Sequence, residues 1–238
     1  MFNNKYKKVL TVLLIITIIA IIGLMAFLIY EQIEKDKTEK DALAAIEEFD
    51  RVHGVNTEVT KAPEEIPTIE EPEETPTIMP PKESSSGSGS GGGSSSGSSD
   101  GKSYYKGFVM IGHVYIPKTG AKYPILEKVT IKSLSAAVVL LYPANAKLNE
   151  PGNVVIAGHN YRNSTFFSKN KTLKEGDKIY ITDESGRKLE YTVYSNFQAT
   201  GEDASFYSRD TGGVPEITLT TCVANDNNKR TIILARAE

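Results

Sequence analysis

The residues best suited to chemistry lie near the C-terminal end of the chain. Cys222 is the only cysteine among 238 residues, and Arg230 follows it eight positions later. A thiol becomes a good nucleophile when it is deprotonated or has a base beside it, and a guanidinium can hold an oxygen atom that gains negative charge. Since a free cysteine is usually buried and inert, Cys222 alone supports both a reactive and a structural interpretation.

A candidate base for this thiol is His159, which follows an apolar stretch at residues 153–158. Gly158 stands directly before it and allows the backbone to approach a neighbouring strand closely. Cysteine, histidine and arginine together suit attack on a carbonyl group followed by acyl transfer. Each residue alone also has an ordinary structural explanation. We expect His113 to be an ordinary strand residue and His53 to be solvated.

Short, β-branched apolar runs fill the C-terminal part of the chain and predict an all-β barrel or sandwich. If Cys222 ends one strand and Arg230 begins the next, with residues 225–228 as the connecting turn, thiol and guanidinium meet near one end of the sheet. The predicted strands are residues 108–116, 123–126, 138–142, 153–158, 178–182, 189–194, 217–222 and 231–235, and the few predicted helices are residues 131–135 and 165–169.

The N-terminal part carries an apolar run over residues 9–30, long enough for a helix to cross a hydrocarbon core of about 30 Å. A cleaved signal peptide has a shorter apolar region and a small-residue cleavage site, and no such site follows Tyr30. We therefore expect an uncleaved single-pass anchor. Lys5, Lys7 and Lys8 precede the run, which predicts a cytoplasmic N-terminus and an extracellular remainder.

Two further segments separate this anchor from the predicted barrel. Residues 31–51 predict a charged helix whose weak apolar stripe, Leu43, Ile46 and Phe49, favours a solvated helix over a coiled coil. A segment rich in Pro and Glu and then a run of Ser and Gly follow, and neither has enough apolar surface to fold. The predicted division is an anchor at residues 1–30, a juxtamembrane helix at 31–51, a disordered linker at 52–101 and a catalytic domain at 102–238.

Charge and composition exclude several classes of function. Residues 101–238 hold eighteen basic against thirteen acidic side chains, and the excess is scattered without an aromatic stripe, which argues against nucleic-acid binding. One cysteine and three dispersed histidines do not suit a Cys/His zinc site. We expect no cofactor, since calcium has only Glu202 and Asp203 to support it.

Three motifs together carry a resemblance to a known family. Residues 218–222 read Thr-Leu-Thr-Thr-Cys and, with Arg230, resemble the TLxTC…R signature of the sortases, the cysteine transpeptidases of Gram-positive cell surfaces. Residues 157–159, Ala-Gly-His, match the histidine motif of the family, and residues 111–125 resemble its first barrel strands. The resemblance covers about residues 107–236 in the family's order and spacing.

This resemblance implies a closed eight-stranded β-barrel with Cys222 as nucleophile, His159 as acid/base, and Arg230 as the substrate-positioning and oxyanion-stabilising residue. It implies surface proteins with an LPxTG-like C-terminal sorting signal as substrates, cut between Thr and Gly to give a thioacyl enzyme. An amine acceptor, such as a peptidoglycan precursor of the cell wall, then takes the acyl group.

Subclass and alternatives follow from departures within the family pattern. The chain has no Trp, carries only Gly and Ser before the barrel and ends at Glu238, which favours a class A-like or class D-like enzyme over a pilus-assembling one. A surface cysteine hydrolase or peptidase is an alternative, although papain-like enzymes place Cys before His. A non-enzymatic, stalked surface adhesion module is the other alternative.

Overall fold

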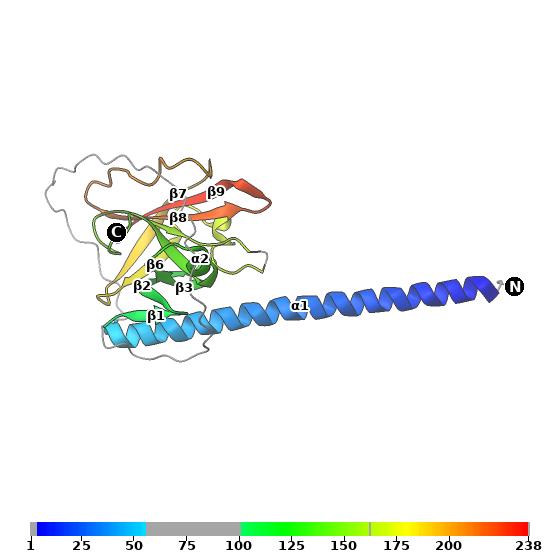
Figure 1. Ribbon diagram of the computed structural model, residues 1–238. Helices are drawn as coiled ribbons and strands as arrows, with labels where there is room; N and C mark the ends of the chain where they lie inside the picture. Colours follow the sequence, from blue (N-terminus) through cyan, green and yellow to red (C-terminus); the bar gives the residue numbers. More distant parts are fainter. Residues whose placement is uncertain (1–3, 56–100, 162, 238) are drawn as a thin grey trace.

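The computed structural model of the chain describes residues 4–55, 101–161 and 163–237. A long helix, α1 (Asn4–His53), precedes a small β-rich body with two short helices (Figure 1). Most of the predicted linker, residues 56–100, lies outside the described residues. After α1 the elements are β1 (Ser103–Tyr105), β2 (Phe108–Ile116), β3 (Ala121–Leu126), α2 (Ile131–Ala136), β4 (Val138–Tyr142), β5 (Gly152–Ala157), the 3₁₀ helix η1 (Asn170–Thr172), β6 (Lys178–Asp183), β7 (Lys188–Thr200), β8 (Pro215–Val223) and β9 (Asp226–Ala237).

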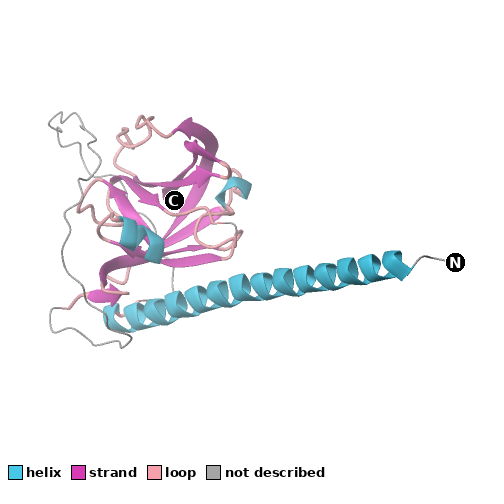
Figure 2. Cartoon of the chain, turned by 45° about the vertical axis from the view of Figure 1, so that its right-hand side comes forward, coloured by secondary structure: helices cyan, strands magenta, loops and turns pink. Residues whose placement is uncertain are grey.

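Strands β2 to β9 close into an eight-stranded barrel in the order β2-β3-β4-β5-β8-β9-β7-β6, and β6 pairs with β2 to complete the ring. Figure 2 shows these strands curving around a common centre. The pairs β3–β4 and β5–β8 are parallel, whereas the other pairs are antiparallel. The short β1 adds to the free part of β2 through a tight turn at Lys106 and Gly107, both with positive φ. The predicted closed barrel is confirmed, and the sandwich is excluded.

The interior of the barrel is filled by aliphatic side chains from all sides of the ring. Ile125, Ile156, Ile181 and Leu219 are each fully buried. Burying such a side chain contributes about 1.5–3 kcal/mol relative to leaving it in water. The β-branched runs that predicted strands therefore also supply the core.

The C-terminal end of α1 is part of this core. Ala42, Ile46 and Phe49 are buried in the same apolar cluster as the barrel residues, and α1 packs against β1 and β3. Their spacing of four and three residues places them on one face of the helix, whereas Leu43 is exposed. The prediction of a solvated helix was therefore wrong, because a small residue, Ala42, completes the stripe that Leu43 does not join.

Two histidines lie where α1 meets the barrel. His113 of β2 is buried, and its Nε2 is 2.8 Å from Oδ1 of Asp50. His53 packs against Phe49 in a tilted arrangement with 4.2 Å between ring centroids, and its Nε2 is 3.1 Å from Oγ of Ser103. His53 is not solvated as predicted, because it follows Phe49 by one helical turn and shares its face. His113 is a strand residue, as expected, and it anchors α1.

The N-terminal half of α1 projects beyond the barrel (Figure 1). Its apolar side chains from Val9 to Tyr30 are exposed, and the helix is long and apolar enough to cross a membrane. This arrangement suggests a single-pass membrane anchor continuous with the helix that docks on the barrel.

The segment between β5 and β6 departs from the prediction. Residues 165–169 do not form the expected helix, since Ser164 and Phe166 adopt left-handed backbone conformations with φ of 65° and 53°. An isolated bridge joins Asn160 to Phe166, and the first helical turn appears only at η1. Residues in the left-handed region interrupt a right-handed helix, and this loop instead turns back towards the end of β5.

Candidate active site

Cys222 and Arg230 are direct partners across the antiparallel pair β8–β9. The next residue of β8, Val223, pairs with Asp226. Residues 227–229 of β9 therefore have no partners on β8 and form an irregularity next to the turn. The turn is tighter than predicted, because Asn225 has a φ of 65° and Asp226 already begins β9. The thiol and the guanidinium therefore come from neighbouring strands at one end of the barrel, as the strand assignment predicted.

His159 is carried to the same end by β5, which runs parallel to β8. The Gly158 N–H donates to the Thr220 carbonyl at 3.1 Å, and the Asn160 side-chain amide donates to the Cys222 carbonyl at 2.8 Å. These two bonds flank His159 in the sequence and tie its backbone to the strand that carries the thiol. The structure thus brings all three predicted site residues together. Asn160 was missed, although an amide side chain directly after the histidine was a usable signal.

Gly158 is required by close packing beside His159. A Cβ atom built at this position would lie 2.7 Å from Cδ2 of Phe167 and 2.9 Å from Cγ1 of Val138. Both neighbours are fully buried and have little room to move. The absence of a side chain at Gly158 therefore lets the end of β5 approach the core and fixes where His159 begins.

The imidazole of His159 is half-buried and stacks on Tyr161, with 4.6 Å between ring centroids and 26° between planes. Tyr161 packs in turn on Phe166, which packs on Tyr123 of β3. Burial lowers the pKa of His159 below its ordinary value because the charged form loses hydration. The imidazole is therefore mainly neutral at pH 7 and able to accept a proton.

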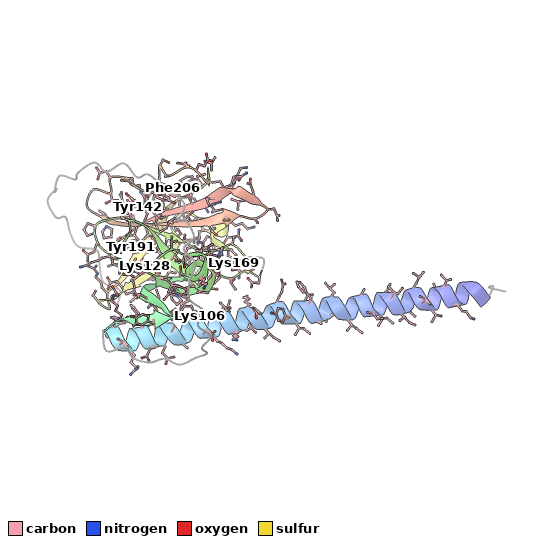
Figure 3. The ribbon with its side chains drawn as sticks, viewed as in Figure 1. Lys106, Lys128, Tyr142, Lys169, Tyr191 and Phe206 are labelled. Carbon is pink, nitrogen blue, oxygen red and sulfur yellow. The ribbon has the colours of Figure 1, made fainter. Side chains whose placement is uncertain are left out.

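An aromatic cluster borders the guanidinium side of the site. Tyr207 packs against Phe206 and Tyr142, with ring centroids 5.0 and 5.4 Å apart, and Figure 3 labels Phe206 and Tyr142 in this cluster. Burial raises the pKa of Tyr207, and the positive charge of Arg230 opposes that rise, which places Arg230 near the phenol. The side-chain amide of Asn153 holds the loop by donating to the carbonyl oxygens of Phe206 and Tyr207.

A buried carboxylate stabilises the start of β8, which leads to Cys222. Glu216 is 2% exposed and forms ion pairs of 2.7 Å with both Arg209 and Arg236. Arg209 also donates to the Thr218 hydroxyl. A buried carboxylate without partners would lower the stability of the fold, and the two arginines remove that penalty. Because Arg209 belongs to the loop before β8 and Arg236 to β9, their ion pairs with Glu216 hold these two segments together. Sequence patterns had not pointed to this network.

Within the described ranges, no group of three or more His, Cys, Asp or Glu side chains is placed to hold a metal ion. Of the two acidic residues considered for calcium, Asp203 accepts hydrogen bonds from Ser205, which lower the pKa of its carboxyl group. Glu202 is exposed. The site as described consists of a thiol, an imidazole and a guanidinium.

Comparison with known proteins supports one family. A model of the sortase domain matches residues 114–238, which is more than half of the chain. Sortase A from Bacillus anthracis is 34% identical over 129 residues, which cover 52% of this chain and 58% of that protein. The chain therefore spans less than two thirds of the length of this curated relative.

Solved structures agree with the sequence comparisons. Sortase A from Corynebacterium diphtheriae superimposes with a TM-score of 0.51 at 29% identity, covering 55% of this chain and 61% of the solved one. A lid mutant of the same protein gives a TM-score of 0.50, also at 29% identity, over 54% and 70%. The domain match, the shared barrel and the sequence identity lead to one conclusion: the chain belongs to the sortase family.

Proposed function

We propose that this sortase is a cysteine transpeptidase in which Cys222 is the nucleophile, His159 the acid/base and Arg230 the oxyanion-stabilising and substrate-positioning residue. The observation that carries the proposal is the pairing of Cys222 with Arg230 across β8–β9. The side-chain amide of Asn160, the residue after His159, donates to the Cys222 carbonyl and so holds this segment beside β8. A thiol, a neutral imidazole and a fixed cation at one end of a barrel suit acyl transfer through a thioester.

In the first half-reaction, His159 accepts the thiol proton. The sulfur of Cys222 then attacks the carbonyl carbon of Thr in the peptide bond between Thr and Gly of an LPxTG-like signal. Arg230 holds the carbonyl oxygen while it carries negative charge. The C–N bond breaks, the leaving glycine amine takes the proton from His159, and a thioester remains on Cys222. An acceptor amine then attacks the thioester, the C–S bond breaks, and the amine proton returns through His159 to the thiolate.

The proposed partners are surface proteins with such sorting signals and an amine acceptor such as a peptidoglycan precursor of a Gram-positive cell wall. We propose a cytoplasmic N-terminus and an extracellular barrel, because Lys5, Lys7 and Lys8 precede the apolar half of α1. The division into anchor, juxtamembrane helix, linker and a catalytic domain at residues 102–238 remains a proposal, as does a class A-like or class D-like subclass. The buried end of α1 adds a helix to the folded body of that domain.

The test uses the full chain in lipid nanodiscs with a set of LPxTG-like peptides and an amine, and products are identified by mass. Transfer to the amine supports a transpeptidase, whereas release of the free acid alone supports the alternative of a hydrolase. His159→Ala should lower the rate by about 10²–10⁴-fold, the usual contribution of general acid/base catalysis. An unchanged rate in a folded His159→Ala protein would assign His159 a structural role.

A further inference from the structure

A groove of about 490 Å³ lies between α1 and the segment that follows His159. It extends from the helix to the loop after β5 and touches the end of α2. The described residues that line it are Glu31, Glu34 and Thr38 of α1, Ser135 of α2, and Tyr161, Asn163, Thr165 and Phe166 of the loop.

The groove begins one aromatic ring away from the proposed catalytic centre. Tyr161, which lines it, is the residue stacked on the imidazole of His159 at 4.6 Å between ring centroids. The floor is well formed, since Thr165 and Phe166 are both buried and the Thr165 hydroxyl donates to Asn163. A molecule in this groove would therefore approach His159 along the face of Tyr161.

The wall formed by α1 is held in place by the docking described above. Phe49 and Ile46 are buried against the barrel, and Asp50 contacts His113 of β2. Thr38 and Glu34 precede this docked stretch by only a few helical turns, and a continuous α-helix transmits the orientation. The groove is therefore a feature of the whole chain, because the barrel alone supplies only one of its two walls.

The position along α1 places the groove at the membrane edge. Glu31 directly follows the apolar run that ends at Tyr30. Figure 1 also shows the β8–β9 hairpin pointing towards the side on which α1 carries its N-terminus, so the end of the barrel with Cys222 faces that way. Both features orient the groove towards substrates that arrive along the bilayer surface.

The lining selects for a cationic, hydrogen-bonding ligand. Glu31 and Glu34 are one helical turn apart on the same face, and no lysine or arginine is among the described residues that line the groove. The nearby Lys35 forms its ion pair with Glu39 instead. Hydroxyl and amide groups of Thr38, Ser135 and Asn163 suit a peptide, and the face of Tyr161 suits an ammonium group.

We infer that this groove binds the second substrate, an amine-bearing cationic peptide, and that Glu31 and Glu34 attract its ammonium group to the thioester on Cys222. The inference rests on the proposed function and adds to it the place and charge of the acceptor. The bound ammonium first releases one proton to solvent. The free amine then forms the C–N bond with the thioester carbonyl carbon, the C–S bond breaks, and the second proton passes from the amine through His159 to the thiolate of Cys222.

The experiment uses the full chain in nanodiscs and compares two acceptors for the same acyl enzyme. The first is a short lysine peptide, which is cationic at neutral pH, and the second is hydroxylamine, which is uncharged there. We expect Glu31→Gln with Glu34→Gln to lower kcat/KM for the lysine peptide about five- to tenfold, as two partly exposed charge interactions allow. The rates of acylation and of transfer to hydroxylamine should stay unchanged.

The matched control neutralises Glu47, which is exposed, and Glu48, which is partly exposed and ion-paired with Arg51. Neither residue lines the groove, so transfer to both acceptors should be unaffected. If the Glu31/Glu34 variant behaves as this control, the groove is not the acceptor site. An equal loss with both acceptors also overturns the inference, because it assigns the carboxylates to folding or acylation. Failure of the wild-type chain to form any acyl enzyme instead refutes the proposed function itself.

Arg162 follows Tyr161 in the sequence and lies outside the described residues. The Glu31/Glu34 changes are therefore repeated in an Arg162→Gln background. The same selective loss for the lysine peptide is expected there. If the loss disappears in this background, the two carboxylates act on Arg162 and not on the acceptor, which contradicts the inference.

Discussion

Gly158→Ala tests how the fold positions the candidate site, since it adds a single methyl group directly before His159. The new Cβ would lie 2.7 Å from Cδ2 and 2.9 Å from Cγ of Phe167, and 2.9 Å from Cγ1 of Val138. Carbon atoms in contact normally lie about 3.5–4.0 Å apart. The end of β5 or its neighbours must therefore move by about 1 Å.

Overpacking of this kind typically costs about 1–3 kcal/mol, because Phe167 and Val138 are fully buried and cannot swing into solvent. A displacement of about 1 Å at a catalytic group can lower a rate by about 10²-fold. We expect Gly158→Ala to lower both the thermal midpoint and the single-turnover acylation rate, with the rate measured on protein shown to be folded.

The control is Gly23→Ala in the apolar half of α1, where an added Cβ meets nothing within 4 Å. This variant should retain the wild-type midpoint and rate. If Gly158→Ala also acylates at the wild-type rate with an unchanged midpoint, the packing at the end of β5 does not set the position of His159, and the reasoning fails.

Three further predictions test separate parts of the structure. Arg230→Lys keeps the positive charge but loses the planar guanidinium, which can donate two parallel hydrogen bonds. Acylation should therefore slow on the order of 10²–10³-fold with little change in the thermal midpoint, and near wild-type kinetics would remove Arg230 from the site. Phe49→Ala should lower the free energy of unfolding, measured in denaturant, by about 3–5 kcal/mol because Phe49 is fully buried. Leu43→Ala should have little effect because Leu43 is exposed, and equal effects of the two changes would contradict the docking of α1. Burial lowers the pKa of His159 below its ordinary value of 6.5, so the acid limb of the pH–rate profile for acylation should have its midpoint below pH 6.5; a midpoint above this value would contradict the assignment.

The strands and the pairing within the site could be predicted because both depend on local sequence, whereas the choice of a closed barrel over a sandwich followed only from the family resemblance. Short apolar runs rich in β-branched residues mark most strands, and β8 and β9 are joined by a short hairpin, so the partnership of Cys222 with Arg230 follows from neighbouring residues. The convergence of His159 was available only through family motifs, since β5 and β8 are distant in sequence and pair in parallel.

The docking of α1 could not be predicted from its own pattern. Ala42 is small, Ile46 and Phe49 lie among many charged residues, and the surface that covers them is made by β1 and β3, far along the chain. A stripe this weak becomes recognisable only when its partner surface is known. The same holds for His53, which is only partly exposed and contacts Ser103.

The loop after His159 was mispredicted for a different physical reason. Ser164 and Phe166 adopt left-handed conformations that residues other than glycine reach only when tertiary contacts support them. Burial of the Phe166 side chain against Tyr123 and Tyr161 supplies that support. A short polar and aromatic stretch in isolation gives no sign of such contacts, and its sequence resembles a helix.

The most direct test of the central claim is the intact mass of the full chain after rapid mixing with an LPxTG-like peptide and acid quenching. We predict a mass increase equal to the acyl group of the peptide up to its threonine. Mild alkaline treatment should remove this group, as it does from a thioester, and proteolysis should map it to Cys222. The adduct should be absent in Cys222→Ala, although the protein remains folded. Cleavage of the peptide by folded Cys222→Ala, or an adduct on any other residue, would contradict the claim.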